Sequence, residues 1–561
     1  MLPHREKYVT YSELTDILRG FQTANPELVS LESIGKSGEG RDLWVLVIGK
    51  DRDRKRPAAW VDGNMHATEV CGSSVALGIA EDLLTLHRTG KIFDLPPHVC
   101  DQLREVLFYI MPRMSPDGAE TVLTQGRYVR SVPRDSRHHA PTPRWIAGDV
   151  DGDGLALVMR KEDPTGEFVT SSVEPNVLLP RTLESVGPFY KVYPEGFIEN
   201  FEGVVPDPFY LSDNDADLNR NFPYAWMPEP EQAGAGRYPT SEPESRAVVE
   251  YTQARPHIFA WLNLHTFGGV YIRPLGTAAD NKMDSRDLAL FHQIAEWGEK
   301  YGGYPTVSGY EEFTYEPDKP LHGDLTEFAY HQLGAIAYVC ELWDLFTVIG
   351  AKKGKKFVDY YSHVTVDDLH RFAKWDREVN HGRVFLPWRK TSHPQLGEVE
   401  VGGFDMRVGM SNPPLEAIDA TCTRQSQAFL RVAAMAPRVS VRHVATKPVA
   451  SGAHEVEIEA SNTGYLPTFV LSSAKKLSLD ARIFVEVTGE RGLEVIGDKR
   501  VCLEHLDGWG RGLFDQSIFL VRSRGSVSSK RARFVVKGAG ALVVRVHGQR
   551  TGEVSAVIEI G

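Results

Sequence analysis

The feature that most constrains the fold is a long alternation of short apolar runs with helical patterns over about the first 385 residues. Residues 43–48, 58–61, 258–264 and 335–339 have the composition of buried strands, and residues 75–86 carry apolar side chains at helical spacing. Ser241-Glu242-Pro243-Glu244 predicts a helix start with the serine as N-cap. This alternation predicts an α/β fold.

Changes in composition indicate further units. Residues from about 134 to 212 are rich in Pro, Gly, Asp and Glu, and we predict a long insertion at the rim of a site. It would interrupt a first unit at 1–390, which is followed by a connection at 391–437 with one helical stretch. Short alternating runs then predict a β-sandwich at 438–561.

Charge and hydropathy exclude several classes of partner. The formal net charge is -12 and no long basic block occurs, so nucleic acid is not expected as a partner. No run of about 18 apolar residues and no signal-peptide pattern is present, which predicts a cytoplasmic protein without a membrane contact. The 5 cysteines are scattered and odd in number, as is typical of reduced thiols. The sequence does not indicate an oligomeric state.

Two histidines and a glutamate suggest a metal site. His66 and Glu69 follow a buried strand and lie three residues apart, so in a turn both side chains project the same way. His265 ends another strand, where sites form in α/β sheets. Two imidazoles, a carboxylate and an open position are the ligand set of catalytic zinc. An isolated His-x-x-Glu pair, however, more often lies in a surface turn.

The order of further motifs resembles the M14 (funnelin) family of zinc metallocarboxypeptidases. After His66-x-x-Glu69 the chain has Ser115-Pro116-Asp117-Gly118, then Asp217-Leu218-Asn219-Arg220-Asn221-Phe222, Leu264-His265-Thr266 and Cys340-Glu341-Leu342. The match covers roughly residues 8–385. It implies a mixed β-sheet flanked by helices, a bound Zn2+, and hydrolysis of C-terminal peptide bonds in peptides with a free C-terminus.

The resemblance implies roles around the metal. His66, Glu69 and His265 match the zinc ligands of the family. Glu341 matches the general base that takes a proton from a metal-activated water. Arg130 matches the arginine that stabilises the oxyanion, where charge develops in the transition state.

The resemblance also implies substrate contacts. Asn219 and Arg220 match the pair that binds the terminal carboxylate, for which the planar fork of an arginine is suited. Arg127 is the first arginine of an Arg-x-x-Arg pair and is predicted to contact the substrate. Thr326 occupies the specificity position, and a threonine favours neither apolar nor basic termini. The family's substrate-closing tyrosine has no direct match, since the spacing leads to Lys319, and Tyr315 is preferred over Tyr310.

A second ion is suggested by Asp149, Asp151 and Asp153, which copy the opening of an EF-hand calcium loop. The twelfth position of that loop is Arg160 instead of an acid. The pattern therefore predicts either a Ca2+ site or an acidic turn whose aspartates cap their own backbone.

Two other functions stay open. One is a zinc-dependent deacylase of N-acyl amino acids that resembles aspartoacylase, which shares the metal ligands and a similar Asn-Arg pair but is much shorter. The other is a non-catalytic peptide-binding protein that retains a peptidase fold.

Overall fold

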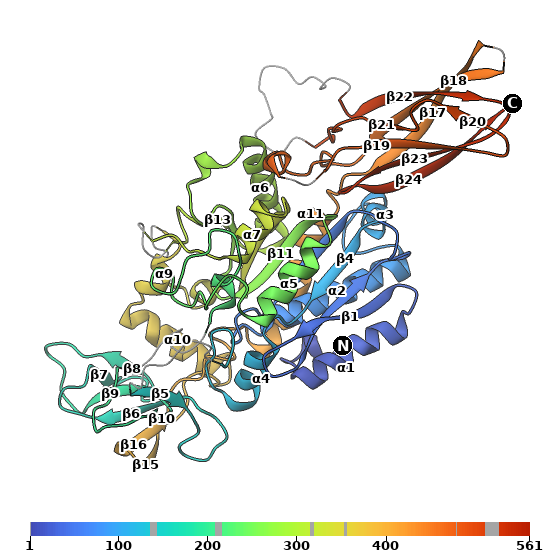
Figure 1. Ribbon diagram of the computed structural model, residues 1–561. Coiled ribbons are helices and arrows are strands. Elements are labelled where there is room, and N and C mark those ends of the chain that lie inside the picture. The colour runs from blue at the N-terminus through green and yellow to red at the C-terminus, as the bar shows by residue number, and fades with distance from the viewer. Residues whose placement is uncertain are drawn as a thin grey trace.

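The computed structural model describes residues 2–134, 143–207, 216–314, 319–352, 356–450, 452–477, 480–510 and 527–561. At its centre is an 8-stranded sheet in the order β1-β2-β4-β3-β11-β14-β12-β13 (Figure 1). Its strands are β1 (Val29–Lys36), β2 (Asp42–Ile48), β3 (Ala58–Gly63), β4 (Leu107–Met111), β11 (Ile258–Thr266), β12 (Val270–Arg273), β13 (Thr306–Ser308) and β14 (Ile336–Leu342). Because parallel and antiparallel pairs both occur, the predicted mixed sheet is confirmed.

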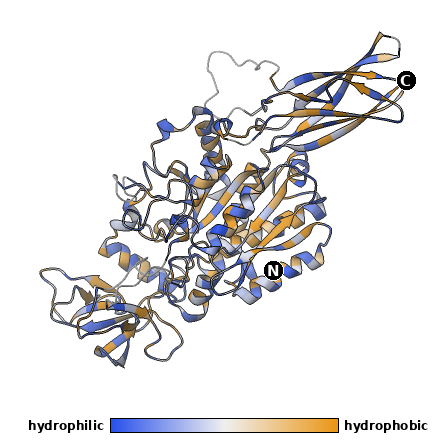
Figure 2. Cartoon of the chain, viewed as in Figure 1, coloured by the Kyte–Doolittle hydropathy of each residue, from blue (hydrophilic) through white to orange (hydrophobic). Residues whose placement is uncertain are grey.

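Helices cover both faces of this sheet. The first face packs against α1 (Tyr11–Ala24), α2 (Cys71–Thr89), α3 (Pro97–Arg104), α6 (Ser285–Trp297) and α11 (Ile418–Ala433). The second face packs against α5 (Pro243–Gln253) and α7 (Leu325–His331). Successive side chains of a strand point to opposite faces, so Val61 and Trp60 lie in different cores. The central strands are accordingly hydrophobic along their length (Figure 2).

The direction of the central strands creates one common edge. β3, β11 and β14 run parallel, and their last residues are register partners: Leu264 lies opposite Gly63, and His265 lies opposite Glu341. Functional side chains at the ends of these strands therefore meet at the carboxyl edge of the sheet.

A second sheet combines two distant parts of the chain. Its order is β15-β16-β6-β9-β7-β8 (Figure 1), with β5 (Arg144–Ala147) and β10 (Gly196–Glu199) paired beside it. The six strands are β6 (Val158–Glu162), β7 (Phe168–Thr170), β8 (Leu178–Pro180), β9 (Phe189–Pro194), β15 (Arg389–His393) and β16 (Gly397–Gly402). Strands from the predicted insertion thus pair with strands at the border of the predicted connection.

The described residues form four further α-helices besides these. The helices are α8 (Leu345–Val348), α9 (Asp359–Ser362) and α10 (Val366–Glu378), and α4 (Pro116–Gln125) lies earlier in the chain. The predicted serine cap of α5 is wrong, because its N-cap is Glu242. The Ser241 hydroxyl instead accepts a hydrogen bond from Nδ2 of Asn221 at 3.0 Å.

The C-terminal part is a sandwich of two four-stranded antiparallel sheets around a common core, as predicted. One sheet contains β17 (Val439–Ala450), β18 (Ala453–Asn462), β22 (Ser529–Lys537) and β20 (Glu494–Ile496). The other contains β21 (Arg500–Cys502), β19 (Phe484–Glu490), β23 (Gly540–Gly548) and β24 (Gly552–Ile560). The exact domain boundaries stay a prediction.

The sandwich packs against the amino ends of the central strands, on the side opposite to the carboxyl edge described above. Arg550, in the turn between β23 and β24, donates hydrogen bonds to the carbonyls of Ile258 and Leu333, which lie at the start of β11 and just before β14. The N–H of Glu553 donates to the carbonyl of Lys55, shortly before β3. Among the described residues, none of the helices combines the length and the apolar composition needed to cross a bilayer.

Candidate active site

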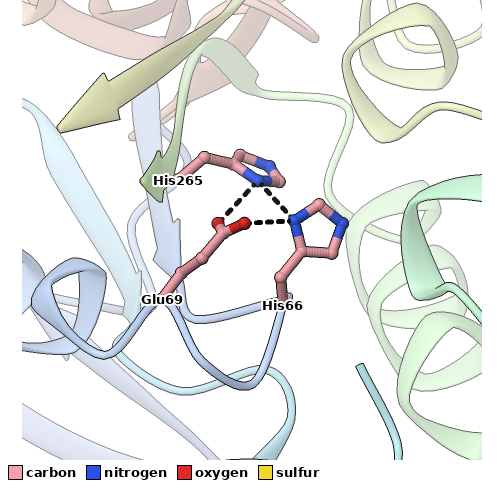
Figure 3. A group of neighbouring side chains, drawn as sticks. All are labelled: His66, Glu69 and His265. Atoms are coloured by element: carbon pink, nitrogen blue, oxygen red, sulfur yellow. Dashed lines mark hydrogen bonds and ion pairs between the residues drawn. The ribbon is translucent and has the colours of Figure 1, made fainter. Parts of the chain in front are cut away.

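Three side chains converge at the carboxyl edge of the sheet (Figure 3). Nδ1 of His66 lies 2.7 Å from Oε1 of Glu69, and Nδ1 of His265 lies 3.0 Å from Oε2 of Glu69 and 3.0 Å from Nδ1 of His66. His66 and Glu69 come from the turn between β3 and α2, and His265 comes from the end of β11.

The turn that presents His66 is held by its own side chains. Asn64 has a positive φ of 57° and donates through Nδ2 to the carbonyls of His66 and Ala67, at 2.8 and 3.0 Å. An asparagine tolerates this left-handed conformation better than most residues. Strand and helix also approach closely, since a Cβ on Gly63 would lie 2.6 Å from the backbone of Gly72.

The outer contacts of the two rings determine where their protons lie. Nε2 of His66 lies 3.1 Å from Oδ1 of Asp217, and Nε2 of His265 lies 2.6 Å from Oδ1 of Asn263. Both partners are acceptors, because Asn263 uses its Nδ2 to donate to Asp62. When a metal ion is bound, each ring would therefore keep its proton on Nε2, facing its outer acceptor, and would offer the lone pair of Nδ1 to the ion.

This arrangement suits a metal ion. The Nδ1 atoms of both rings and the carboxylate of Glu69 face one another, so a cation placed between them could be bound by all three. Burial lowers the pKa of His265, which favours the neutral ring that a metal ion requires. The ligand atoms of a tetrahedral zinc site lie about 3.3 Å apart, given Zn–N bonds of about 2.0–2.1 Å. The observed spacing is close to this value, so the residues fit a zinc ion.

A buried carboxylate lies beside this group. Glu341 is the register partner of His265. Its Oε2 is buried and has no hydrogen-bond partner within the described ranges. Burial and the nearby Glu69 carboxylate raise the pKa of Glu341 well above its usual range. A carboxyl group in this state can take up and release a proton.

Two arginines complete the polar part of the site. Arg130 donates through Nε to Oδ2 of Asp217 at 3.1 Å, and its Nη1 lies 3.5 Å from Oε1 of Glu69. Arg220 donates through Nη1 to the carbonyl of Asn219 at 2.6 Å. Asn219 accepts a hydrogen bond from the N–H of Leu325 at 3.0 Å, which ties this loop to α7.

One pocket contains most of the residues predicted from the sequence. Its lining includes His66, Glu69, Arg130, Asn219, Arg220, His265, Thr326 and Glu341. Arg127 is not part of this lining, and its role stays a prediction. Tyr315 lies outside the described residues. No described residue of the predicted insertion lines the pocket, whereas Tyr361, Met406 and Met410 do.

The aspartates predicted to bind calcium lie elsewhere. Oxygen atoms of Asp149, Asp151 and Asp153 lie within 4.8 Å of one another. The carboxylates of Asp151 and Asp153 are paired with Arg389, and Asp149 accepts from the backbone N–H groups of Gly152 and Gly154. These contacts are those of an acidic turn, the alternative prediction, and they give no support to a calcium ion.

The outer contacts of the histidines were not predicted, although the sequence contains a signal for each. Asp217 begins the Asp-Leu-Asn-Arg-Asn motif. Asn263 lies two residues before His265, and side chains two apart in a strand share a face. Asp62 is the register partner of Asn263 in the neighbouring strand.

Comparisons with known proteins agree with this geometry. The family model described as zinc carboxypeptidase matches residues 14–154 and 200–349, and a model described as a domain of unknown function matches residues 438–559. Carboxypeptidase D of Mus musculus is 26% identical over 293 residues, which are 51% of this chain and 14% of that protein. Carboxypeptidase A4 of Mus musculus is 29% identical over 278 residues, which are 50% of this chain and 48% of that protein. The matched region thus spans less than half the length of either relative.

Solved structures are also similar to this chain. Thrombin activatable fibrinolysis inhibitor is 17% identical, with a TM-score of 0.44 and coverage of 77% of both chains. Carboxypeptidase A from Helicoverpa armigera is 15% identical, with a TM-score of 0.43 and coverage of 77% of this chain and 74% of that chain.

Proposed function

The chain belongs to the M14 family of zinc carboxypeptidases, and we propose that it is a zinc-dependent carboxypeptidase that removes residues from the C-terminus of peptides. The observation that carries this proposal is the convergence of His66, Glu69 and His265 in one pocket with the carboxylate of Glu341. The pocket also contains Arg130 and Arg220, which can neutralise anionic groups of a substrate and of its transition state.

Arg220 and Asn219 would hold the terminal carboxylate of the peptide. The amide oxygen of Asn219 is used by the N–H of Leu325, so its NH2 group is the donor available to a substrate. The guanidinium of Arg220 adds charge-assisted bonds. A peptide anchored in this way would present its last peptide bond to the metal ligands.

Glu341 would act as the general base and Arg130 would stabilise the oxyanion. When bound, zinc supplies a polarised carbonyl and an acidified water. Glu341 would take a proton from the attacking water and return it to the leaving amine. Arg130, oriented by Asp217, places its positive charge where the carbonyl oxygen becomes negative.

A peptide digest tests this function and separates it from the alternatives. The zinc-loaded protein is incubated with matched peptides that end in a free carboxylate or an amide, and the products are identified by mass spectrometry. We expect stepwise loss of C-terminal residues from the free acids, abolished by a chelator and restored by zinc. Release of an acyl acid from N-acyl amino acids instead would indicate a deacylase. Zinc binding without hydrolysis of either substrate would indicate a binding protein.

A further inference from the structure

The pocket contains a second buried carboxylate that the proposed chemistry does not use. Glu327 lies on α7, lines the pocket and is only 3% exposed. Neither of its carboxylate oxygens has a hydrogen-bond partner among the described residues. Buried polar groups are nearly always hydrogen-bonded, and an unsatisfied carboxylate is costly to bury. A ligand group that donates hydrogen bonds would remove this cost.

The helix that carries Glu327 is fixed to the proposed carboxylate-binding residues. Asp324 is the N-cap of α7 and accepts from the N–H of Glu327 at 3.0 Å and from the hydroxyl of Thr326. The N–H of Leu325, the first residue of α7, donates to Oδ1 of Asn219. The hydroxyl of Thr326 is therefore engaged, and Glu327 is held in a fixed position relative to Asn219.

The other charges near Glu327 leave its carboxylate available. Nε2 of His331 lies 3.5 Å from Oε2 of Glu327, close enough for an ion pair, but no hydrogen bond joins the two side chains. Arg273 also lines the pocket, but its guanidinium is paired with Asp280. Asp324 is occupied as a helix cap. Of Asp280, Asp324 and Glu327, only Glu327 accepts no hydrogen bond within the described residues.

The remaining wall suits a long side chain with a charged end. Apolar side chains of Ile272, Phe313, Leu321 and Val339 line the pocket. Gly276 lies next to Glu327, since a Cβ built on Gly276 would be 3.5 Å from Cγ of Glu327. Gly276 and Glu327 both line the pocket, so the pocket includes this carboxylate in its wall. Arginine and lysine combine an aliphatic stem with a cationic end, as such a pocket requires.

We propose that Glu327 selects peptides whose C-terminal residue is cationic, arginine or lysine, by pairing with that side chain. This inference rests on the proposed carboxypeptidase function. An acidic terminal residue would instead require Arg273, whose charge is already paired with Asp280. An apolar terminal residue would leave both carboxylate oxygens of Glu327 buried without a hydrogen bond.

The test compares arginine with citrulline, a neutral side chain of nearly the same shape. Binding of two N-acetylated dipeptides that differ only in this residue is measured by calorimetry on the zinc-loaded Glu341→Gln variant, which separates recognition from turnover. A charge-assisted bond to a buried carboxylate should make the arginine peptide bind about tenfold or more tightly. Glu327→Gln in the same background should bring the two affinities within about twofold of each other. Glu296→Gln, at an exposed position of α6, should keep the difference.

The outcomes distinguish this inference from the function on which it rests. The role of Glu327 is overturned if the Glu341→Gln protein binds both peptides equally, or binds a glutamate-ended peptide more tightly. Either result leaves the carboxypeptidase proposal intact. A preference for arginine that survives Glu327→Gln overturns it as well. If the zinc-loaded wild-type protein also fails to bind or hydrolyse any peptide, the proposed function fails, and this inference fails with it.

Discussion

Asp217 contacts His66 and so connects the metal ligands with the arginine of the site. Its Oδ1 lies 3.1 Å from Nε2 of His66, while its Oδ2 accepts from Nε of Arg130 at the same distance. One carboxylate therefore orients a ring of the metal set and the group proposed to stabilise the oxyanion. The carboxylate is buried, and Arg130 and His66 outweigh the effect of burial and hold the pKa of Asp217 well below its usual range.

Asp217→Asn should weaken zinc binding by about 10–100-fold, because outer partners of metal-bound histidines fix the ring and increase its basicity. The dissociation constant can be measured by competition with a chromogenic chelator, without any activity assay. Asp16→Asn, at an exposed position of α1, is the matched control and should bind zinc like the parent. Equal zinc affinity in the Asp217 and Asp16 variants would contradict this role.

Glu341→Gln should keep zinc bound but lower kcat by about 10²–10⁴-fold, because a general base acts in the chemical step and not in metal binding. Zinc content by elemental analysis and kcat on a good peptide substrate together check this. Glu296→Gln controls for loss of a carboxylate elsewhere. Turnover near that of the parent would exclude Glu341 as the base.

Arg220→Ala should act mainly on peptides with a free C-terminus. Loss of charge-assisted bonds to the terminal carboxylate should lower kcat/KM for free acids by roughly 10–100-fold. Amidated peptides lack that carboxylate and should be nearly unaffected. Arg286→Ala, at an exposed position of α6, serves as the control. An equal loss on both peptide classes would show that Arg220 does not bind the terminus.

The sequence was most informative where local patterns and ordered motifs coincide. The strands that end at Gly63, Thr266 and Leu342 are nearly continuous apolar runs, so their presence and their common α/β arrangement could be predicted. His66, Glu69 and His265 lie at the ends of such elements, where parallel strands must bring them to one edge.

Contacts between distant segments could not be predicted in the same way. The pairing of Glu400 in β16 with Arg160 in β6 joins residues 240 apart and leaves no periodic signal in either segment. Glu327 reads as an ordinary helical glutamate, and only the surrounding pocket shows that it is buried without a hydrogen bond. The error at Ser241 has a related cause, because its hydroxyl is used by the distant Asn221.

Acidification should destabilise the fold through His257. Burial, together with the positive charges of Arg255, Arg550 and Lys55, lowers the pKa of His257 to about 4. Because the folded state binds this proton less readily than the unfolded state, the stabilisation is present above about pH 6.5 and is lost as pH falls toward 4. The shift corresponds to a change of up to about 3 kcal/mol in the free energy of unfolding.

His257→Gln should flatten this dependence while allowing a hydrogen bond to the hydroxyl of Tyr109, which lies 3.0 Å from Nε2 of His257. Urea unfolding at several pH values between 4 and 7 measures the effect. His381→Gln, at an exposed position, should leave the pH dependence as in the parent. If the free energy of unfolding changed equally with pH in the wild-type protein and in the His257→Gln variant, His257 would not be the source of the pH dependence.

Arg550 should matter for stability and not for catalysis. It is 1% exposed, burial lowers its pKa to about 10, and its guanidinium binds the carbonyls of Ile258 and Leu333. Arg550→Met would leave both buried carbonyls without this donor, at a cost of about 1–3 kcal/mol each. Urea unfolding should therefore show a clear loss of stability for Arg550→Met but not for Arg491→Met, at an exposed position of the sandwich.

The same substitution should have little effect on catalysis. Ile258 and His265 lie at opposite ends of β11, about 23 Å apart along the strand, so kcat/KM of the folded Arg550→Met protein should stay within about twofold of that of the wild-type protein. A large fall in kcat/KM without loss of stability would mean that the sandwich acts on the active site from the far edge of the sheet.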